Sequence, residues 1–102
     1  MHIEITKEEI PYRFEMELAK ELFTFEVHYN KRFDFFTIGI EKDGQVIVAG
    51  EKVVLDLPLF YALNDKRLPK VTITPKDNSG SETRVSFENL GKTVLLEIGG
   101  LS

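Results

Sequence analysis

The chain has 102 residues, of which 42% are hydrophobic and 29% charged, a composition typical of one folded domain spanning residues 1–102. It contains no cysteine, which excludes disulfides, thiolate metal ligands and cysteine nucleophiles and leaves the redox compartment undetermined. Its net charge of −4 is unlike that of proteins with a basic stripe for phosphate backbones, so we expect no nucleic-acid partner.

The N-terminal residues predict two short strands. Ile3 and Ile5 alternate with polar neighbours and predict a short strand or ordered arm, followed by a solvated turn over residues 7–9. Alternation over residues 12–18 predicts a half-buried strand with a charged outer face, although a helix over residues 13–22 is the competing interpretation. We expect neither export nor membrane insertion, because the first residues lack a signal-peptide pattern and no stretch reaches about 18 apolar residues.

Residues 23–50 contain the strongest strand pattern. Every second residue from Phe23 to Tyr29 is apolar, and the apolar pattern resumes over residues 36–40. Asp43-Gly44 then precedes a further apolar run that ends at Gly50. Asp-Gly between two such runs favours a type I′ hairpin, because both turn residues take positive φ angles. The sequence therefore predicts three consecutive antiparallel strands.

The loop lengths predict the registers of both hairpins. A two-residue loop at Asp43-Gly44 predicts these pairs: Lys42 with Gln45, Ile40 with Ile47, and Ile38 with Ala49. A four-residue loop over residues 30–33 predicts these pairs: Val27 with Phe36, Phe25 with Ile38, and Phe23 with Ile40. A loop one residue shorter would turn half of the apolar side chains to the wrong face, so we expect an even loop length.

The second half of the chain predicts shorter strands separated by polar loops. In chain order we expect a strand over 51–58 ended by Pro58, a helical turn or wide loop over 59–63, a polar turn over 64–69, a strand over 71–74 halted by Pro75, a turn-rich segment over 76–83, an edge segment at Val85 and Phe87, a last strand over 93–98, and a loose tail over 99–102. The fold class is thus all-β: a compact antiparallel sandwich or partly open barrel of seven or eight short strands, with at most one helical turn.

No pattern in the sequence predicts catalysis, a cofactor or a metal site. Leu90 to Thr93 reads LGKT, but a phosphate-binding loop requires Gly where Ser86 stands and a following helix rather than a strand. His28 lies on the polar phase of its strand, and the other histidine, His2, is at the terminus. The remaining candidates lie in turns or on outward phases and are expected to be surface residues: Glu8, Glu9, Glu15, Glu17, Glu26, Ser79, Ser81 and Ser86.

The aromatic residues are more informative. Phe35 and Phe36 are adjacent and cannot both point inward on a regular strand, so one of them is exposed, bulged or buried against something else. The apolar run over residues 57–63 has a similar excess, and exposed aromatics are typical interface anchors. An unusually thick core is the alternative. The candidate interface consists of Arg32, Phe35, Phe36, Leu59, Phe60 and Arg67.

A series of short motifs extends over most of the chain. In order they are Tyr29-Asn30-Lys31-Arg32, Phe36, Asp43-Gly44 with Gly50, Leu57-Pro58-Leu59, Arg67-Leu68-Pro69, the polar 76–83 loop, and Leu90-Gly91 before Val94 to Ile98. This order resembles the small baseplate plug proteins of contractile-tailed phages, a family described for a cyanophage. The chain departs from that pattern at Phe36, where Trp is expected, at Lys70, where Gly is expected, and in the polar loop, which lacks a Pro.

The resemblance implies a non-enzymatic virion structural protein without a cofactor. Such a protein is assembled in the bacterial cytoplasm and located in the virion tail, where it contacts hub, tube or baseplate proteins. Exposed Phe35, Leu59 and Phe60 would then dock onto neighbouring subunits, with Arg32 and Arg67 as polar anchors. Homo-oligomerisation is left open. The alternative function is a small ligand-binding or protein-interaction β-barrel module, whose aromatics would line a cavity.

Overall fold

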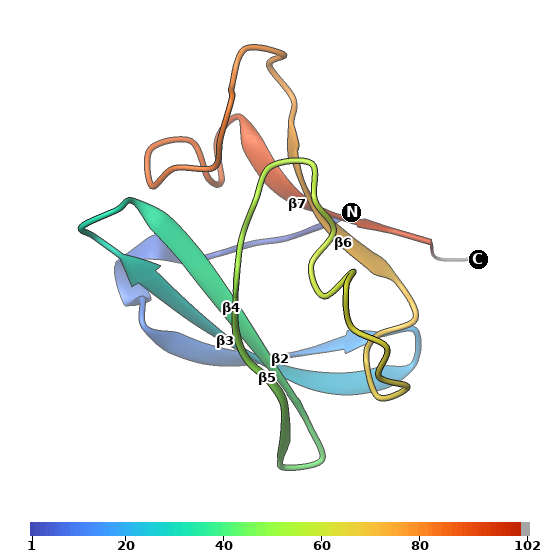
Figure 1. The fold of residues 1–102 in the computed structure, drawn as a ribbon. Helices are drawn as coiled ribbons and strands as arrows, with labels where there is room; N and C mark the ends of the chain where they lie inside the picture. Colours follow the sequence, from blue (N-terminus) through green and yellow to red (C-terminus); the bar gives the residue numbers. More distant parts are fainter. Residues whose placement is uncertain (101–102) are drawn as a thin grey trace.

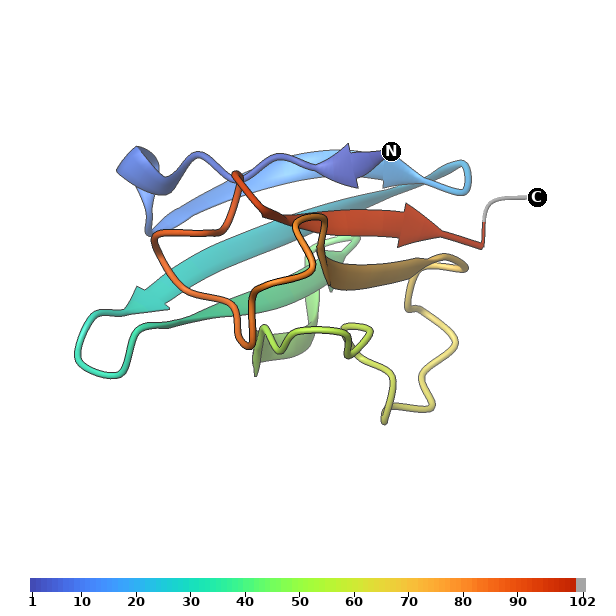
Figure 2. The same ribbon diagram turned by 90° about the horizontal axis from the view of Figure 1, so that it is seen from above.

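A computed structural model describes residues 1–100, which form seven strands and one short 3-10 turn. The elements are β1 (His2–Ile3), η1 (Lys7–Glu9, the 3-10 turn), β2 (Tyr12–Leu18), β3 (Glu21–Asn30), β4 (Phe35–Lys42), β5 (Gln45–Lys52), β6 (Thr72–Asp77) and β7 (Val94–Gly99). They form two antiparallel sheets, ordered β2-β3-β4-β5 and β1-β7-β6. Figures 1 and 2 show the two sheets on opposite sides of the molecule, with long loops after β5 and β6. The all-β prediction is confirmed, and the sheets do not close into a barrel.

The predicted alternation places one face of each long strand in the core. Phe23, Phe25 and Phe36 are almost completely buried and fill the space between the sheets. The strand interpretation of β2 is confirmed, since all its residues pair with β3. The rings of Phe14 in β2 and Phe25 in β3 stack with centroids 5.4 Å apart. Burial of these aromatic rings is the main source of favourable free energy in a core of this kind.

The predicted register of the β3–β4 hairpin is wrong by two residues. Val27 pairs with Ile38 and Phe25 with Ile40, so the loop covers residues 31–34. The side-chain oxygen of Asn30 accepts the N–H of Phe33 at 3.0 Å, which makes Asn30 the first residue of the turn. Because the loop length is even, as expected, the same side chains still face the core.

The β4–β5 hairpin begins as predicted and then departs from the predicted register. Lys42 pairs with Gln45, and the φ angles of Asp43 (53°) and Gly44 (77°) fit a type I′ turn. The predicted pairs of Ile40 with Ile47 and Ile38 with Ala49 are wrong. These residues pair differently: Ile40 with Val48, and Ile38 with Glu51.

The β4–β5 register shifts twice, first between Glu41 and Ile40 and then between Ile40 and Ile38. The second shift lies at Gly39, whose lack of a side chain allows it. An added Cβ at Gly39 would lie 2.4 Å from the carbonyl oxygen of Ala49, so the two backbones approach more closely than any side chain permits. One residue of β4 therefore lies opposite two residues of β5, Ala49 and Gly50, as in a β-bulge.

The prediction of a strand over residues 51–58 is wrong, because β5 ends at Lys52 and the described residues contain no strand between Lys52 and the start of β6 at Thr72. Instead this segment lies along the outer edge of β6. The N–H groups of Asp56 and Leu59 donate to the carbonyl oxygens of Pro75 and Ile73, both at 2.8 Å. Residues 59–63 form the wide loop that was one of the two expectations.

Pro75 does not halt its strand, contrary to the prediction. The carbonyl group of Pro75 points toward Asp56, away from β7, and the N–H that proline lacks would point the same way. The missing donor therefore falls on the outer edge of β6, and the pairing with β7 continues to Asp77. The predicted edge segment at Val85 and Phe87 is also wrong, because no strand forms between β6 and β7.

The turn-rich segment after β6 is organised by Asp77. Its carboxylate accepts the N–H groups of Ser79 and Glu82, both at 2.8 Å, and the hydroxyl of Ser79 at 2.7 Å. These donors lower the pKa of Asp77, with the Ser79 hydroxyl as the largest cause. The predicted last strand forms one residue later than expected, as β7 over Val94–Gly99 rather than residues 93–98. Gly99 therefore belongs to the strand and not to the tail, of which Leu101 and Ser102 lie outside the described residues.

Replacing Gly39 by Ala should destabilise the fold. The new Cβ would overlap the backbone of Ala49, and backbone cannot move aside as a flexible side chain does. We expect the free energy of unfolding to fall by about 2–3 kcal/mol, measured by urea denaturation.

The matched control is Gly50→Ala, whose Cβ meets Thr37 Oγ1 at an ordinary 3.6 Å. It should leave stability within about 1 kcal/mol of the parent. Equal losses for the two variants would contradict the close approach of β4 and β5.

Candidate interaction surface

A carboxylate at the end of the β3–β4 turn joins this turn to the loop before β7. Asp34 Oδ1 accepts the hydroxyl of Tyr29 at 2.7 Å and the N–H of Phe87 at 2.9 Å. Asp34 Oδ2 accepts a hydrogen bond from Arg84 Nη1 at 3.0 Å, and Arg84 Nη2 also donates to the Asp34 carbonyl oxygen. Asp34 has a φ angle of 55°, a left-handed conformation that Asp tolerates better than most residues. One side chain thereby connects positions more than 50 residues apart.

These hydrogen bonds set the charge state of the site. The backbone N–H of Phe87, followed by the hydroxyl of Tyr29, lowers the pKa of Asp34 by stabilising its ionised form. The bond to Asp34 raises the pKa of Tyr29, because ionising the phenol would bring a second negative charge to the same place. Asp34 is therefore an ionised acceptor at neutral pH, and its role is structural.

An aromatic cluster lies beside Asp34. The ring of Tyr29 is 4.9 Å from that of Phe36 and 5.0 Å from that of Phe87, measured between centroids. Lys7 Nζ donates to the Phe87 carbonyl oxygen at 2.7 Å and lies 5.0 Å from the centroid of its ring. The cluster thus links η1, the four-stranded sheet and the loop before β7.

The structure separates the two adjacent phenylalanines at the start of β4. Phe36 points into the core and has no exposed surface, whereas Phe35 points to the other face of the sheet and is half-buried. Lys52 Nζ lies 5.0 Å from the centroid of the Phe35 ring. Of this pair, Phe35 is therefore the residue that a partner could reach.

The expectation that Leu59 and Phe60 are exposed is wrong, because both are buried. The N–H of Leu59 donates to β6, which draws this part of the loop onto the sheet edge. Phe60 has a φ angle of 64°, and its N–H donates to the carboxylate of Glu51. These two bonds turn both side chains inward.

The two predicted arginine anchors have different surroundings. Arg67 donates from Nε and Nη2 to the two carboxylate oxygens of Asp65, at 3.0 and 2.7 Å, so it already has a partner in the chain. This contact, with the Arg67 side chain as the largest cause, lowers the pKa of Asp65 to about 2 and raises that of Arg67. Arg32 lies over the ring of Phe33 instead, with Cζ 5.3 Å from the centroid.

Several exposed apolar residues were not among the predicted interface residues, among them Phe33, Tyr61 and Leu63. Phe33 is 66% exposed in the β3–β4 turn, and Tyr61 and Leu63 are 63% and 45% exposed in the loop after β5. Each lies in a turn or loop, where no strand phase directs a side chain inward. Large apolar residues at such positions were the signal available in the sequence.

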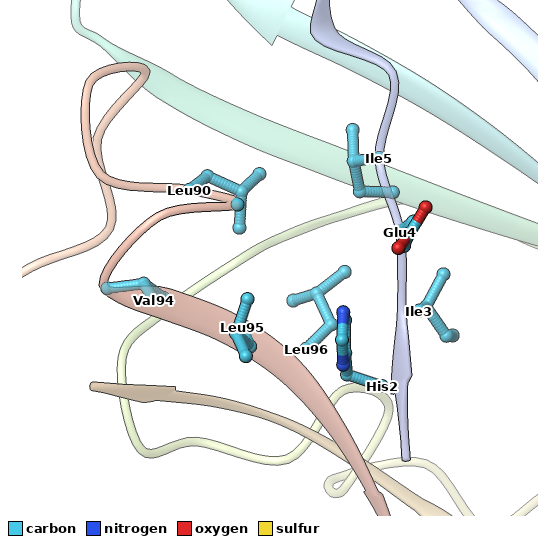
Figure 3. Close-up of a pocket in the computed structure, with 9 residues that line it drawn as sticks. His2, Ile3, Glu4, Ile5, Leu90, Val94, Leu95 and Leu96 are labelled. Carbon is cyan, nitrogen blue, oxygen red and sulfur yellow. The ribbon is translucent and has the colours of Figure 1, made fainter. Parts of the chain in front are cut away.

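The surface also contains shallow crevices. One, of about 270 Å³, lies where β1 stops pairing with β7 after Ile3, and Figure 3 shows Ile5 and Leu90 on its two sides. A larger one, of about 440 Å³, runs along residues 58–73 beside Tyr61 and Leu63. In residues 1–100 no helix is long and apolar enough to cross a membrane. The same residues contain no group of three or more His, Cys, Asp or Glu side chains arranged to bind a metal ion.

Comparison with known proteins identifies a family. A family model described as the cyanophage baseplate Pam3 plug gp18 matches residues 1–100, which is almost the whole chain. Neither a search of curated proteins nor a search of solved structures found a match.

Asp34→Asn should lower stability and flatten its dependence on pH. Because the folded pKa of Asp34 is lowered, its stabilising effect is complete above the unfolded pKa of about 4 and disappears as the pH falls through the folded pKa. We expect a loss of about 1–2 kcal/mol at neutral pH, since the carboxylate is partly exposed, and a smaller loss in acid. Urea denaturation from pH 7 down to pH 2 measures both effects.

Asp43→Asn is the control, because Asp43 has a similar φ angle of 53° in the β4–β5 turn. It makes the same chemical change without the Tyr29, Arg84 and Phe87 contacts. A loss for Asp34→Asn that is equal at pH 7 and pH 2 would contradict the role of the charge.

Proposed function

The chain belongs to the cyanophage baseplate plug family, and we propose that it acts by packing against hub or tube proteins of a phage tail, without catalysis. The observation that carries this proposal is the family match over residues 1–100. Membership indicates a baseplate plug protein located in the virion tail. The packing partners and the absence of an enzymatic activity are the parts that we propose.

The arrangement of charged groups supports a structural role. The groups with shifted pKa values are held in turns or between segments: Glu21, Tyr29, Asp34, Asp65, Arg67 and Asp77. The largest cause of each shift is a hydrogen bond to another group of the chain, so these groups already have partners within the fold. His28 contacts Glu26 at 3.1 Å on the exposed outer face of the four-stranded sheet, where such a pair contributes little.

The exposed apolar residues support a packing mechanism. Phe33, Tyr61 and Leu63 are exposed although the chain has a well-filled core, and burying them against a partner is favourable by about 25 cal/mol per Å² of apolar surface. We propose that Phe33, Phe35 and Tyr61 contact neighbouring subunits, with Arg32 and Arg67 beside them. Phe36, Leu59 and Phe60 belong to the core and support this surface from below.

The chain should be present in assembled particles. We expect mass spectrometry of particles purified from phage-producing cells to detect it, and antibody labelling under the electron microscope to mark the tail tip. It would be made in the host cytoplasm and join the tail there, so lysates that contain assembly intermediates should show it on tails without heads. Intact particles without this chain would refute the proposal.

The neighbours Phe60 and Tyr61 separate core from interface. Phe60→Ala should lower the free energy of unfolding by about 3–5 kcal/mol, because a buried ring is removed. Tyr61→Ala should change stability by less than about 0.5 kcal/mol, since the side chain is exposed, but should reduce the amount of protein in particles. Denaturant unfolding and quantitative mass spectrometry of particles measure the two effects, and the reverse order would contradict the assignment.

A further inference from the structure

A groove with apolar walls forms where three separate segments of the chain meet. It has a volume of about 190 Å³ and lies between the β3–β4 turn, the segment after β5 and residues 83–85. We call it the Phe33 groove and define it by Phe33, Phe35, Lys52, Val54, Leu55 and Arg84. Pockets for drug-sized ligands are roughly 300–1,000 Å³, so this volume suits one or two protruding side chains better than a small molecule.

The groove is held open by contacts within the chain. Arg84 is fixed by its two bonds to Asp34 on one side. On the other side the N–H of Val53 donates to the carbonyl oxygen of Phe36 at 2.9 Å, which fixes the start of the segment after β5. A preformed groove needs little ordering when a partner binds, which favours affinity.

Its apolar walls are accessible. Phe33 is 66% exposed and Val54 is 39% exposed, and Phe35 is half-buried beside them. Val53 and Val85 are buried beneath and line the floor. Exposed apolar walls above a buried apolar floor can hold the anchoring side chain of a partner protein.

The rim of the groove is positively charged, in contrast to the net charge of −4 of the whole chain. Lys52 Nζ lies 5.0 Å from the Phe35 ring centroid, and Arg32 Cζ lies 5.3 Å from that of Phe33. Within residues 1–100 neither Lys52 nor Arg32 forms an ion pair, whereas Arg84 is paired with Asp34. Two cations are therefore available beside the aromatic walls.

We propose that the Phe33 groove binds a segment of a neighbouring baseplate protein that presents an apolar or aromatic side chain next to Asp or Glu. The apolar side chain packs between Phe33 and Phe35, and the carboxylates pair with Lys52 and Arg32. Opposite charges across an interface select the partner and its register, while the buried apolar contact supplies most of the affinity. This inference rests on the proposed function and adds the chemistry of the partner.

The first test changes the groove and measures incorporation into particles. In cells that make only the tagged variant, Phe33→Ala and Lys52→Glu should each lower the amount of protein per particle about tenfold, by quantitative mass spectrometry. Leu22→Ala and Lys20→Glu are matched controls, because Leu22 is 54% exposed near the start of β3 and Lys20 lies in the turn just before it, at the other end of the strand from Phe33. Circular dichroism melting of each purified variant establishes that it is folded.

A second test identifies the partner and needs no destabilising change. A benzophenone amino acid at position 33 should, on irradiation of assembled particles, cross-link to a segment of another tail protein that has Asp or Glu next to an apolar residue. A cross-link to a second copy of this chain, or to a segment without carboxylates, overturns the proposal. So does normal incorporation of Phe33→Ala and Lys52→Glu. Absence of the parent chain from particles refutes the proposed function instead, which keeps the two failures distinct.

Discussion

The surface around the Phe33 groove depends on the hydrogen bonds to Asp34. The two sheets are joined by long loops, and the Asp34 carboxylate connects the β3–β4 turn of one sheet with the loop that leads into β7 of the other. A buried or half-buried carboxylate is tolerated only where several donors replace its water, and here Tyr29, Arg84 and Phe87 do so. The same bonds hold Arg84 beside the β3–β4 turn, so that Phe33 and Arg84 both line the groove.

This arrangement explains how a small domain can combine a stable core with an apolar surface. The aromatic rings on the inner phases of β3 and β4 fill the space between the sheets, so the core does not need Phe33, Tyr61 or Leu63. Those residues lie in turns that are shaped by polar side chains, as Asn30 shapes the turn that contains Phe33. Membership of the baseplate plug family implies interaction with other baseplate proteins, and an exposed apolar surface suits such an interaction.

The sequence predicted the local structure well and the long-range contacts poorly. The alternation of apolar residues identified β2, β3 and β4, an apolar run identified β7, and Asp43-Gly44 identified its turn, because all these signals are local. The register of the β3–β4 hairpin was missed because one hydrogen bond of Asn30 shifts the loop. The bulge opposite Gly39 depends on the close approach of the Ala49 backbone. The continuation of β6 through Pro75 depends on which edge of the strand Pro75 turns toward Asp56.

The residues of the candidate interface also differ in whether the sequence or the tertiary structure determined their exposure. The sequence by itself determined that Phe35 and Phe36 cannot both point inward on a regular strand, that the chain is all-β, and, through the order of its motifs, to which family it belongs. Only the tertiary structure decided that Leu59 and Phe60 are buried and that residues 33–35, 52–55 and 83–85 form one groove. The physical reason is that strand phase is set by neighbouring residues. The burial of loop residues, in contrast, is set by hydrogen bonds to distant segments, which no local pattern encodes.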